Sequence, residues 1–239
     1  AKLAYVTPSH QFPTGAVMPL ARRLELLAWA ERQNVYVIED DYDSEYRYGG
    51  RPIEAIQGLD RSGRVIYMGT FSKTVFPALR VGYLVLPPPL VEPFRRAKWL
   101  ADRHTPILEQ EALAEFIAGG HYERHLRRTR QRIAARRAAL LEALEESLGG
   151  RAEVLGENAG LHLMVWLKGV GDKGLGRLIG RAAGAGVGIY SILPYYLKPP
   201  RRAGLLLGFA SLDEEEIREG IARLARVMGC STRGSSANG

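Results

Sequence analysis

The sequence has little cysteine and no long hydrophobic run, and each absence excludes a class of protein. A single cysteine, Cys230, among 239 residues excludes an internal disulfide framework and suits a reducing compartment. No run of about eighteen apolar residues is present, so no transmembrane helix is predicted. The first residues also lack the charged and apolar regions of a signal peptide. We therefore expect a cytoplasmic protein with no membrane partner.

Several catalytic and metal-binding patterns are missing as well. The sequence contains no Gly-rich nucleotide fingerprint and no pattern typical of a nucleophilic triad. His121 and His125 are four residues apart, but no third ligand lies near them, so we expect no metal site. His162 lies between two leucines on a predicted strand, and we interpret it as a core or rim histidine.

The chain does have enough apolar residues for a sizeable core, and it is basic. Hydrophobic residues make up 46% of the sequence, which suits one large domain or one large and one small domain. The net charge of +7 permits nucleic-acid or phosphate partners. Arginines follow one side of a long predicted helix, Tyr122–Leu148, which leaves open a DNA-binding module. Because aromatic residues do not interleave with these arginines, a solvated helix face is the favoured interpretation.

Hydrophobic periodicity predicts alternating strands and helices in the first half of the chain. The predicted strands are Lys2–Thr7, Val35–Ile38, Arg64–Met68 and Val81–Leu86. The predicted helices are Pro19–Arg32, Leu90–Asp102, Ile107–Ala118 and Tyr122–Leu148, with a loop or short helix at Pro52–Leu59. A strand, a helix and a second strand joined over this length imply parallel strands with a right-handed crossover.

After Gly149 and Gly150 the pattern changes to a small α+β unit. Its predicted strands are Ala152–Leu155, Leu161–Leu167, Val187–Tyr190 and Ala203–Phe209, and its predicted helices are Lys173–Ala185 and Asp213–Met228, the latter capped by Ser211 or Asp213. We predict a partial large domain over 1–120, a long connecting helix over 121–150, a small domain over 151–229 and a disordered tail over 230–239. Because the chain opens directly on a core strand, we expect it to be an N-terminally truncated part of a longer protein.

Polar side chains follow two of the predicted strands. Asp40 and Tyr42 come directly after Val35–Ile38, and Lys73 comes just after Arg64–Met68. Two hydroxyls and a guanidinium accompany this lysine: Thr70, Ser72 and Arg80. Ligands of open α/β sheets bind beyond the carboxyl ends of the strands, so we expect these side chains at one site. The alternatives are a solvated acidic loop and ordinary loop cations.

This set of side chains is what pyridoxal phosphate requires. A lysine can form an imine with the cofactor, and a carboxylate can keep the pyridine nitrogen protonated. A phenol can bond the ring oxygen, while hydroxyls and an arginine can bind the phosphate. The sequence therefore favours a pyridoxal phosphate site.

Four segments together carry a resemblance to a known family. They are TPSHQFPTG at Thr7–Gly15, EDDYDSEYRY at Glu39–Tyr48, YMGTFSK at Tyr67–Lys73 and NAGLHL at Asn158–Leu163. These segments resemble the aminotransferase-like domain of the MocR subgroup of GntR family transcriptional regulators. The lysine segment with Arg80–Tyr83 is similar to that of fold-type-I aminotransferases. The resemblance runs from the first residue to about Met228.

The resemblance implies a fold and roles for individual residues. The implied fold is an α/β, partial PLP-transferase fold type I large domain, with a mostly parallel sheet and helices, plus a small α+β C-terminal domain. Lys73 would be the aldimine lysine, Asp40 the partner of the pyridine nitrogen and Tyr42 the partner of the ring oxygen. The phosphate would be held by three residues: Thr70, Ser72 and Arg80.

Asp43 bears on the choice between a regulator and an enzyme. It stands where many plain aminotransferases carry a tyrosine, whereas the spacing of Asp40 and Tyr42 resembles the regulator subgroup. The resemblance implies an effector-sensing domain in which an amine or amino-acid effector exchanges onto the aldimine, or in which the cofactor itself is sensed. The alternative is a working class I/II aminotransferase, in which Lys73 would also move the α-proton.

The resemblance also implies partners beyond this chain. Family members carry an N-terminal winged helix-turn-helix, absent here, through which operator DNA would be bound, and they form homodimers. An arginine for the effector carboxylate is implied near Ser191–Leu197, but that segment has none. The nearest cations are Lys198, Arg201 and Arg202, and Arg202 is the candidate.

Overall fold

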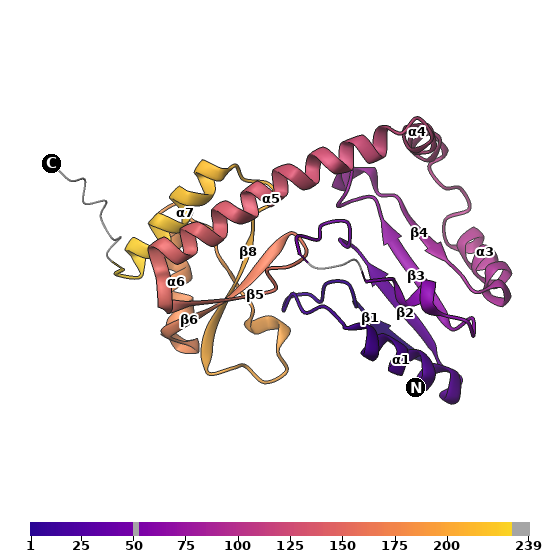
Figure 1. Ribbon diagram of the computed structural model, residues 1–239, viewed down its shortest axis with the longest axis horizontal. Helices are drawn as coiled ribbons and strands as arrows, with labels where there is room; N and C mark the ends of the chain where they lie inside the picture. Colours follow the sequence, from indigo (N-terminus) through magenta and orange to yellow (C-terminus); the bar gives the residue numbers. More distant parts are fainter. Residues whose placement is uncertain (50–52, 231–239) are drawn as a thin grey trace. The chain divides into compact units, whose positions relative to one another are not determined.

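The computed structural model describes residues 1–49 and 53–230, which form two compact units (Figure 1). The first unit contains residues 1–12 and 16–129, and the second contains 13–15 and the residues from 130 onward. The boundary at 129 and 130 lies inside the long helix α5, His121–Leu148. Our division into a large domain, a connecting helix and a small domain stays a prediction. The predicted tail, apart from Cys230, lies outside the described residues.

A four-stranded sheet forms the centre of the first unit, in the order β1-β2-β3-β4 (Figure 1). Its strands are β1 (Leu3–Val6), β2 (Tyr36–Asp41), β3 (Val65–Thr70) and β4 (Gly82–Val85). The first three are parallel, which confirms the expected parallel pairing, and β4 runs antiparallel to β3. In this register Asp40 lies beside Met68.

Two helices cover one face of this sheet. They are α1 (Leu20–Gln33) and α2 (Ile56–Leu59), and their apolar side chains form one core with the strands: Leu27, Ala30, Val37, Ile56 and Val65. The first unit also contains α3 (Pro88–Asp102) and α4 (Ile107–Ala118). None of the side chains of α3 is buried. Side chains of α3, β3 and β4 instead line a common cavity.

The end of β2 is a correction to the sequence prediction. The strand was expected to stop at Ile38, before the acidic cluster, but it continues to Asp41. Glu39 and Asp41 alternate onto the α1 face, where both are buried. Hydrogen bonds satisfy their carboxylates there, so acidic residues can continue a strand. Asp40 consequently lies within β2 and faces the opposite side.

The second unit is built on an antiparallel sheet in the order β5-β6-β8-β7. The strands are β5 (Ala152–Leu155), β6 (His162–Gly171), β7 (Tyr190–Ser191) and β8 (Arg202–Gly208). Its helices are the second part of α5 together with α6 (Asp172–Gly184) and α7 (Glu214–Val227). The predicted cap of α7 is confirmed at Asp213, which forms a reciprocal capping box with Glu216.

The predicted strand Val187–Tyr190 is wrong in its position. Only Tyr190 and Ser191 pair with β8, because the amide of Val187 donates to the Ala182 carbonyl, at 2.9 Å, and so closes the end of α6.

His162 is buried, as expected for a core histidine, and its Nε2 lies 3.3 Å from the Pro13 carbonyl oxygen. A Cβ on Gly15 would lie 2.3 Å from the Gly156 Cα, so this contact requires glycine.

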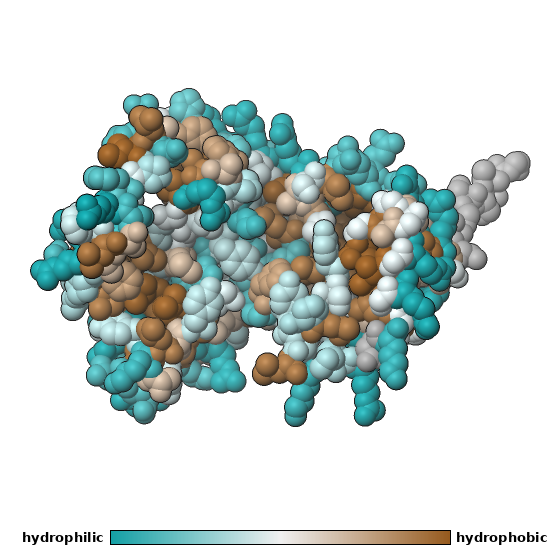
Figure 2. Space-filling model, turned by 180° about the vertical axis from the view of Figure 1, so that it is seen from behind, coloured by the Kyte–Doolittle hydropathy of each residue, from teal (hydrophilic) through white to brown (hydrophobic). Residues whose placement is uncertain are grey.

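Hydrophobic side chains are also exposed on the surface, as Figure 2 shows for the face seen from behind. In the first unit they include Tyr83, Leu84 and Val85 of β4 and Trp99 and Leu100 of α3. No helix in the described part of the chain combines the length and the apolar character needed to cross a membrane.

Candidate functional site

Asp40 is the centre of the candidate site. It is the last but one residue of β2, and its Oδ2 accepts a hydrogen bond from the Tyr5 hydroxyl of β1. Partial burial, followed by this hydrogen bond, raises the pKa of Tyr5 to about 12. Sequence reasoning did not single out Tyr5. Tyr5 pairs with Ile38 of β2, and Ile38 and Asp40 share a face because they are two residues apart on the strand. The alignment of these two strands is the signal that could have pointed to Tyr5.

Lys73 lies three residues beyond the end of β3, in a turn whose backbone is held at several points. The Ser72 amide donates to Thr70 Oγ1 at 3.1 Å, and the Phe71 amide donates to the Val81 carbonyl at 3.1 Å. The Tyr46 hydroxyl donates to the carbonyl of Lys73 itself, at 3.0 Å. The lysine therefore projects from a fixed backbone, which reduces the conformational entropy lost when its amine binds a partner.

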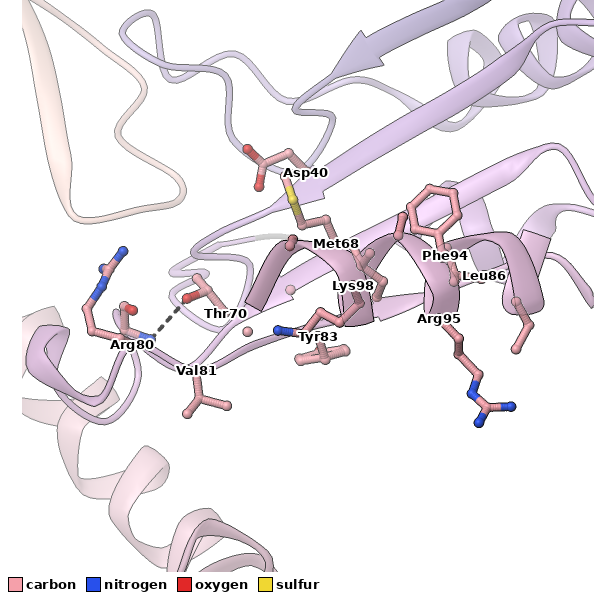
Figure 3. Close-up of a pocket in the computed structure, with 17 residues that line it drawn as sticks. Asp40, Met68, Thr70, Arg80, Val81, Tyr83, Leu86, Phe94, Arg95 and Lys98 are labelled. Atoms are coloured by element: carbon pink, nitrogen blue, oxygen red, sulfur yellow. Dashed lines mark hydrogen bonds between the residues drawn. The ribbon is translucent and has the colours of Figure 1, made fainter. Parts of the chain in front are cut away.

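Two cavities meet at Asp40, and both lie wholly within the first unit. One, of about 810 Å³, is lined by Asp40 with Thr70, Ser72 and Arg80. Figure 3 shows Thr70 and Arg80 at one end of it, and Phe94 of α3 towards the other. The second cavity, of about 820 Å³, is lined by Asp40, Tyr42 and Lys73 together with Tyr5 and residues of the 6–18 segment.

The six predicted residues therefore surround one region but divide between its two cavities. The amine, the phenol and the carboxylate share the second cavity, and the hydroxyls and the guanidinium share the first. Asp40 belongs to both. This division separates groups that suit an aldehyde and a ring from groups that suit an anion.

Arg80 has an unusual backbone conformation. It ends the short 3-10 helix Pro77–Leu79 with a φ of 53°, in the left-handed region that glycine adopts more readily. A side chain at such a position costs conformational energy. A glycine would remove that cost but also the guanidinium that lines the first cavity.

The acidic cluster at the end of β2 is not a solvated loop. Relative exposure is 0% for Glu39, 8% for Asp41 and 1% for Asp43. Glu39 accepts the Ile56 and Gln57 amides at 2.9 and 2.8 Å, and Asp41 accepts the Tyr67 hydroxyl at 2.8 Å. Burial raises the pKa of Glu39, and the two amides oppose that effect.

Arg23 is a buried charge that sequence reasoning missed. Its guanidinium donates to three backbone carbonyls, those of Met18, Glu54 and Pro8, at 3.0, 2.9 and 2.9 Å. It also lies 3.8 Å from Glu39 Oε1. Two of these carbonyls belong to the loop that lines the second cavity, so Arg23 fixes one wall of the site. Its spacing of four from Leu27, on the buried stripe of α1, was the available signal.

Tyr42 and Asp43 contact the same loop at His10. The Tyr42 hydroxyl donates to the His10 carbonyl at 2.7 Å, and His10 Nδ1 lies 2.8 Å from Asp43 Oδ2. Burial, and then the charge of Asp43, raise the pKa of Tyr42. Burial raises the pKa of Asp43 as well, while the hydrogen bond with His10 opposes it. Sequence reasoning did not assign His10 a role.

Arg202, the candidate effector residue, has partners within the second unit. Its Nη2 lies 3.0 Å from Glu153 Oε2, and its guanidinium carbon lies 4.4 Å from the centre of the Trp166 ring. Trp166 belongs to β6 and Glu153 to β5, so the guanidinium lies over β6 on the side towards β5. The assignment of Arg202 to an effector stays a prediction.

The fold and the lysine site define a class, which comparison with known proteins identifies. The first unit has three parallel strands, an antiparallel fourth strand and a lysine after β3. Residues 5–228 match the model of the aminotransferase class I and II family, and the chain belongs to this family. The kynurenine aminotransferase of Pyrococcus horikoshii, solved in complex with PMP, superposes with a TM-score of 0.85 at 34% identity. The match covers 95% of this chain and 56% of that one, and it confirms the predicted fold type I class.

Curated relatives include helix-turn-helix regulators. The chain is 44% identical to the HTH-type transcriptional regulator YhdI of Bacillus subtilis, over 93% of this chain and 47% of that protein. It is 41% identical to the probable rhizopine catabolism regulatory protein MocR of Rhizobium meliloti, over 93% of this chain and 45% of that protein. The resemblance to MocR-type regulators is thereby confirmed. The chain spans about half the length of these relatives.

Proposed function

We propose that this chain is the pyridoxal-phosphate-binding, effector-sensing part of a MocR-type transcriptional regulator. The observation that carries the proposal is the meeting of the two cavities at Asp40, with Lys73 and Tyr42 on one side and the hydroxyls and Arg80 on the other. The regulator relatives support the sensing role.

The residues around Asp40 fit this cofactor by their chemistry. Pyridoxal phosphate, when bound, supplies an aldehyde that reacts with amines and a ring that withdraws electrons. Lys73 offers the amine, and Asp40 offers a carboxylate for the pyridine nitrogen. Thr70, Ser72 and Arg80 offer two hydroxyls and a bidentate cation for the phosphate.

In this proposal either an effector amine competes with Lys73 for the cofactor, or the cofactor itself is the signal. The effector in this proposal is a small amine or an amino acid, and Arg202 is the candidate for its carboxylate. The complete regulator in this proposal is a homodimer that binds operator DNA through an N-terminal winged helix-turn-helix. Binding of the signal at the Lys73 site would then alter DNA binding elsewhere in the regulator.

The cofactor assignment is tested by reconstitution with pyridoxal phosphate and visible absorbance. We expect the wild type to show the band of a lysine-bound cofactor and Lys73→Ala to lose it. Lys98→Ala is the matched control, because Lys98 lines the first cavity from α3 and has no assigned role. A band that persists in Lys73→Ala contradicts the assignment.

A working aminotransferase is the second candidate, because the solved neighbours include enzymes of that activity. Repeated turnover of an amino donor and a keto acid by the reconstituted protein would favour the enzyme. The sensor proposal expects the effector to change the absorbance without sustained product formation.

A further inference from the structure

Asp40 differs from the other carboxylates at the end of β2 in what binds it. Glu39, Asp41 and Asp43 are buried, and each is hydrogen-bonded inside the protein. Within the described residues, the only hydrogen bond to Asp40 comes from the Tyr5 hydroxyl, which donates to Oδ2. A carboxylate can accept several hydrogen bonds, so Oδ1 of Asp40 keeps its full capacity. Asp40 is therefore the carboxylate that can meet a ligand, and Tyr5 is the side chain that orients it.

The register of two parallel strands brings Tyr5 to Asp40. Tyr5 of β1 pairs with Ile38 of β2, and Asp40 lies two residues further along the same face. The terminal torsion of an aspartate is broad, so without a partner its carboxylate can turn freely. A hydrogen bond from a neighbouring strand removes that freedom. Tyr5 thus fixes the carboxylate at the place where the two cavities meet.

The phenol of Tyr5 orients the carboxylate without cancelling its charge. An arginine or a lysine in the same place would form an ion pair and neutralise Asp40. A neutral hydroxyl donates one proton and leaves the negative charge on the carboxylate. Partial burial, and then the hydrogen bond with Asp40, raise the pKa of Tyr5 to about 12, so the phenol remains a donor near neutral pH. The charge of Asp40 therefore stays available to a cationic N–H group that enters the cavities.

We propose that Tyr5 is a positioning residue that holds Oδ2 of Asp40 and so leaves Oδ1 to accept a hydrogen bond from the ring nitrogen of the cofactor. The inference rests on the proposed function and deepens it, because it names the group that aims the Asp40 carboxylate. The simpler explanation is a surface hydrogen bond, since Tyr5 is 60% exposed. Such a bond would not distinguish one ligand from another. A role through Asp40 would affect only ligands that carry the ring nitrogen.

The test compares the binding of two compounds to the full chain, followed by absorbance. They are pyridoxal phosphate and its deaza analogue, in which a C–H group replaces the ring nitrogen. Both carry the aldehyde and the phosphate, but only pyridoxal phosphate can donate an N–H to Asp40. Tyr5→Phe removes a single hydroxyl from an exposed side chain, so it opens no internal cavity. Tyr36→Phe is the matched control, because Tyr36 lies on the same face of β2 as Asp40 but lines neither cavity.

Selectivity for the ring nitrogen decides the inference. We expect Tyr5→Phe to bind pyridoxal phosphate about fivefold more weakly than the wild type does, as the loss of one hydrogen bond implies. The deaza analogue is expected to bind both proteins equally, and Tyr36→Phe is expected to match the wild type with both compounds. An equal loss of both compounds in Tyr5→Phe overturns the inference, because a general structural effect would then explain the data. Unchanged binding of pyridoxal phosphate overturns it as well.

A measurement without cofactor separates this inference from the proposed function. In the chain labelled with ¹³C at the aspartate carboxyl groups, the Asp40 resonance is the one lost in Asp40→Asn. We expect it to shift in Tyr5→Phe and to keep its position in Tyr36→Phe. No shift in Tyr5→Phe overturns the inference, even if the wild type binds the cofactor. Failure of the wild type to bind pyridoxal phosphate would contradict the proposed function, and the titration of the wild type alone reveals it.

Discussion

At the scale of single residues, two adjacent arginines of α1 differ in their burial. Arg23 is 1% exposed and donates to three backbone carbonyls near Glu39. Arg22 forms an ion pair with Glu25 at 2.8 Å, but these side chains are 72% and 62% exposed. A buried partner is costly to remove because it leaves charge and carbonyls unsatisfied, whereas an exposed pair is screened by water.

We expect Arg23→Ala to lower the free energy of unfolding by about 3–5 kcal/mol, the range for breaking a buried ion pair. Arg22→Ala is the matched control, and its expected change is too small to resolve. Urea denaturation of both variants measures the difference. Equal stability of the two variants would contradict the role given to Arg23.

At the scale of elements, α5 contacts the lysine turn through the Tyr122 ring, which lies against Phe71, and through the His125 side chain. His125 Nε2 lies 2.8 Å from the carbonyl oxygen of Thr74, the residue after Lys73. A carbonyl accepts, so Nε2 carries the proton. The helix therefore contacts the backbone beside Lys73 directly, at its first turns and within the first unit.

We expect His125→Ala to speed amide hydrogen exchange in residues 71–76 by roughly fivefold, as the loss of a hydrogen bond of ~1 kcal/mol implies. His121→Ala is the control on the same helix, because His121 contacts Phe116 and Arg124. Hydrogen exchange measured by mass spectrometry resolves this segment. Identical exchange in the wild type and His125→Ala would show that the contact does not restrain the turn.

Helices and strands could be predicted from the sequence where their apolar residues repeat with one clear period. The strands around the site and the long helix α5 were placed within a few residues, because apolar side chains repeat there at regular spacing. The end of β2 was misplaced because charge was taken as a sign of a loop. The burial of Glu39 depends on Arg23 and on two backbone amides, and sequence patterns along one strand do not show such partners.

The six candidate residues were chosen from the sequence, but their arrangement was not predictable from it. Lys73 and Asp40 were chosen because each was expected to follow a strand end, where ligands of such sheets bind, and their roles stay predictions. The pairing of His10 with Asp43 joins residues 33 positions apart, and neither side chain signals the other locally. The contact of Tyr5 with Asp40 likewise depends on the register of two strands.

At the scale of the whole molecule, the candidate site lies within the first unit, and the chain passes to the second unit in α5 and around residues 13–15. The curated relatives that it matches are about twice as long. Within this chain, every residue proposed to hold the cofactor belongs to the first unit. Cofactor binding at Lys73 is thus the claim on which sensing depends.

Chemical trapping at Lys73 tests that claim most directly. The protein is incubated with pyridoxal phosphate, reduced with borohydride, digested and analysed by mass spectrometry. The proposal predicts a phosphopyridoxyl group on Lys73 and none on the other five lysines: Lys2, Lys98, Lys168, Lys173 and Lys198. A modification spread over these lysines, or an unmodified Lys73, would contradict it.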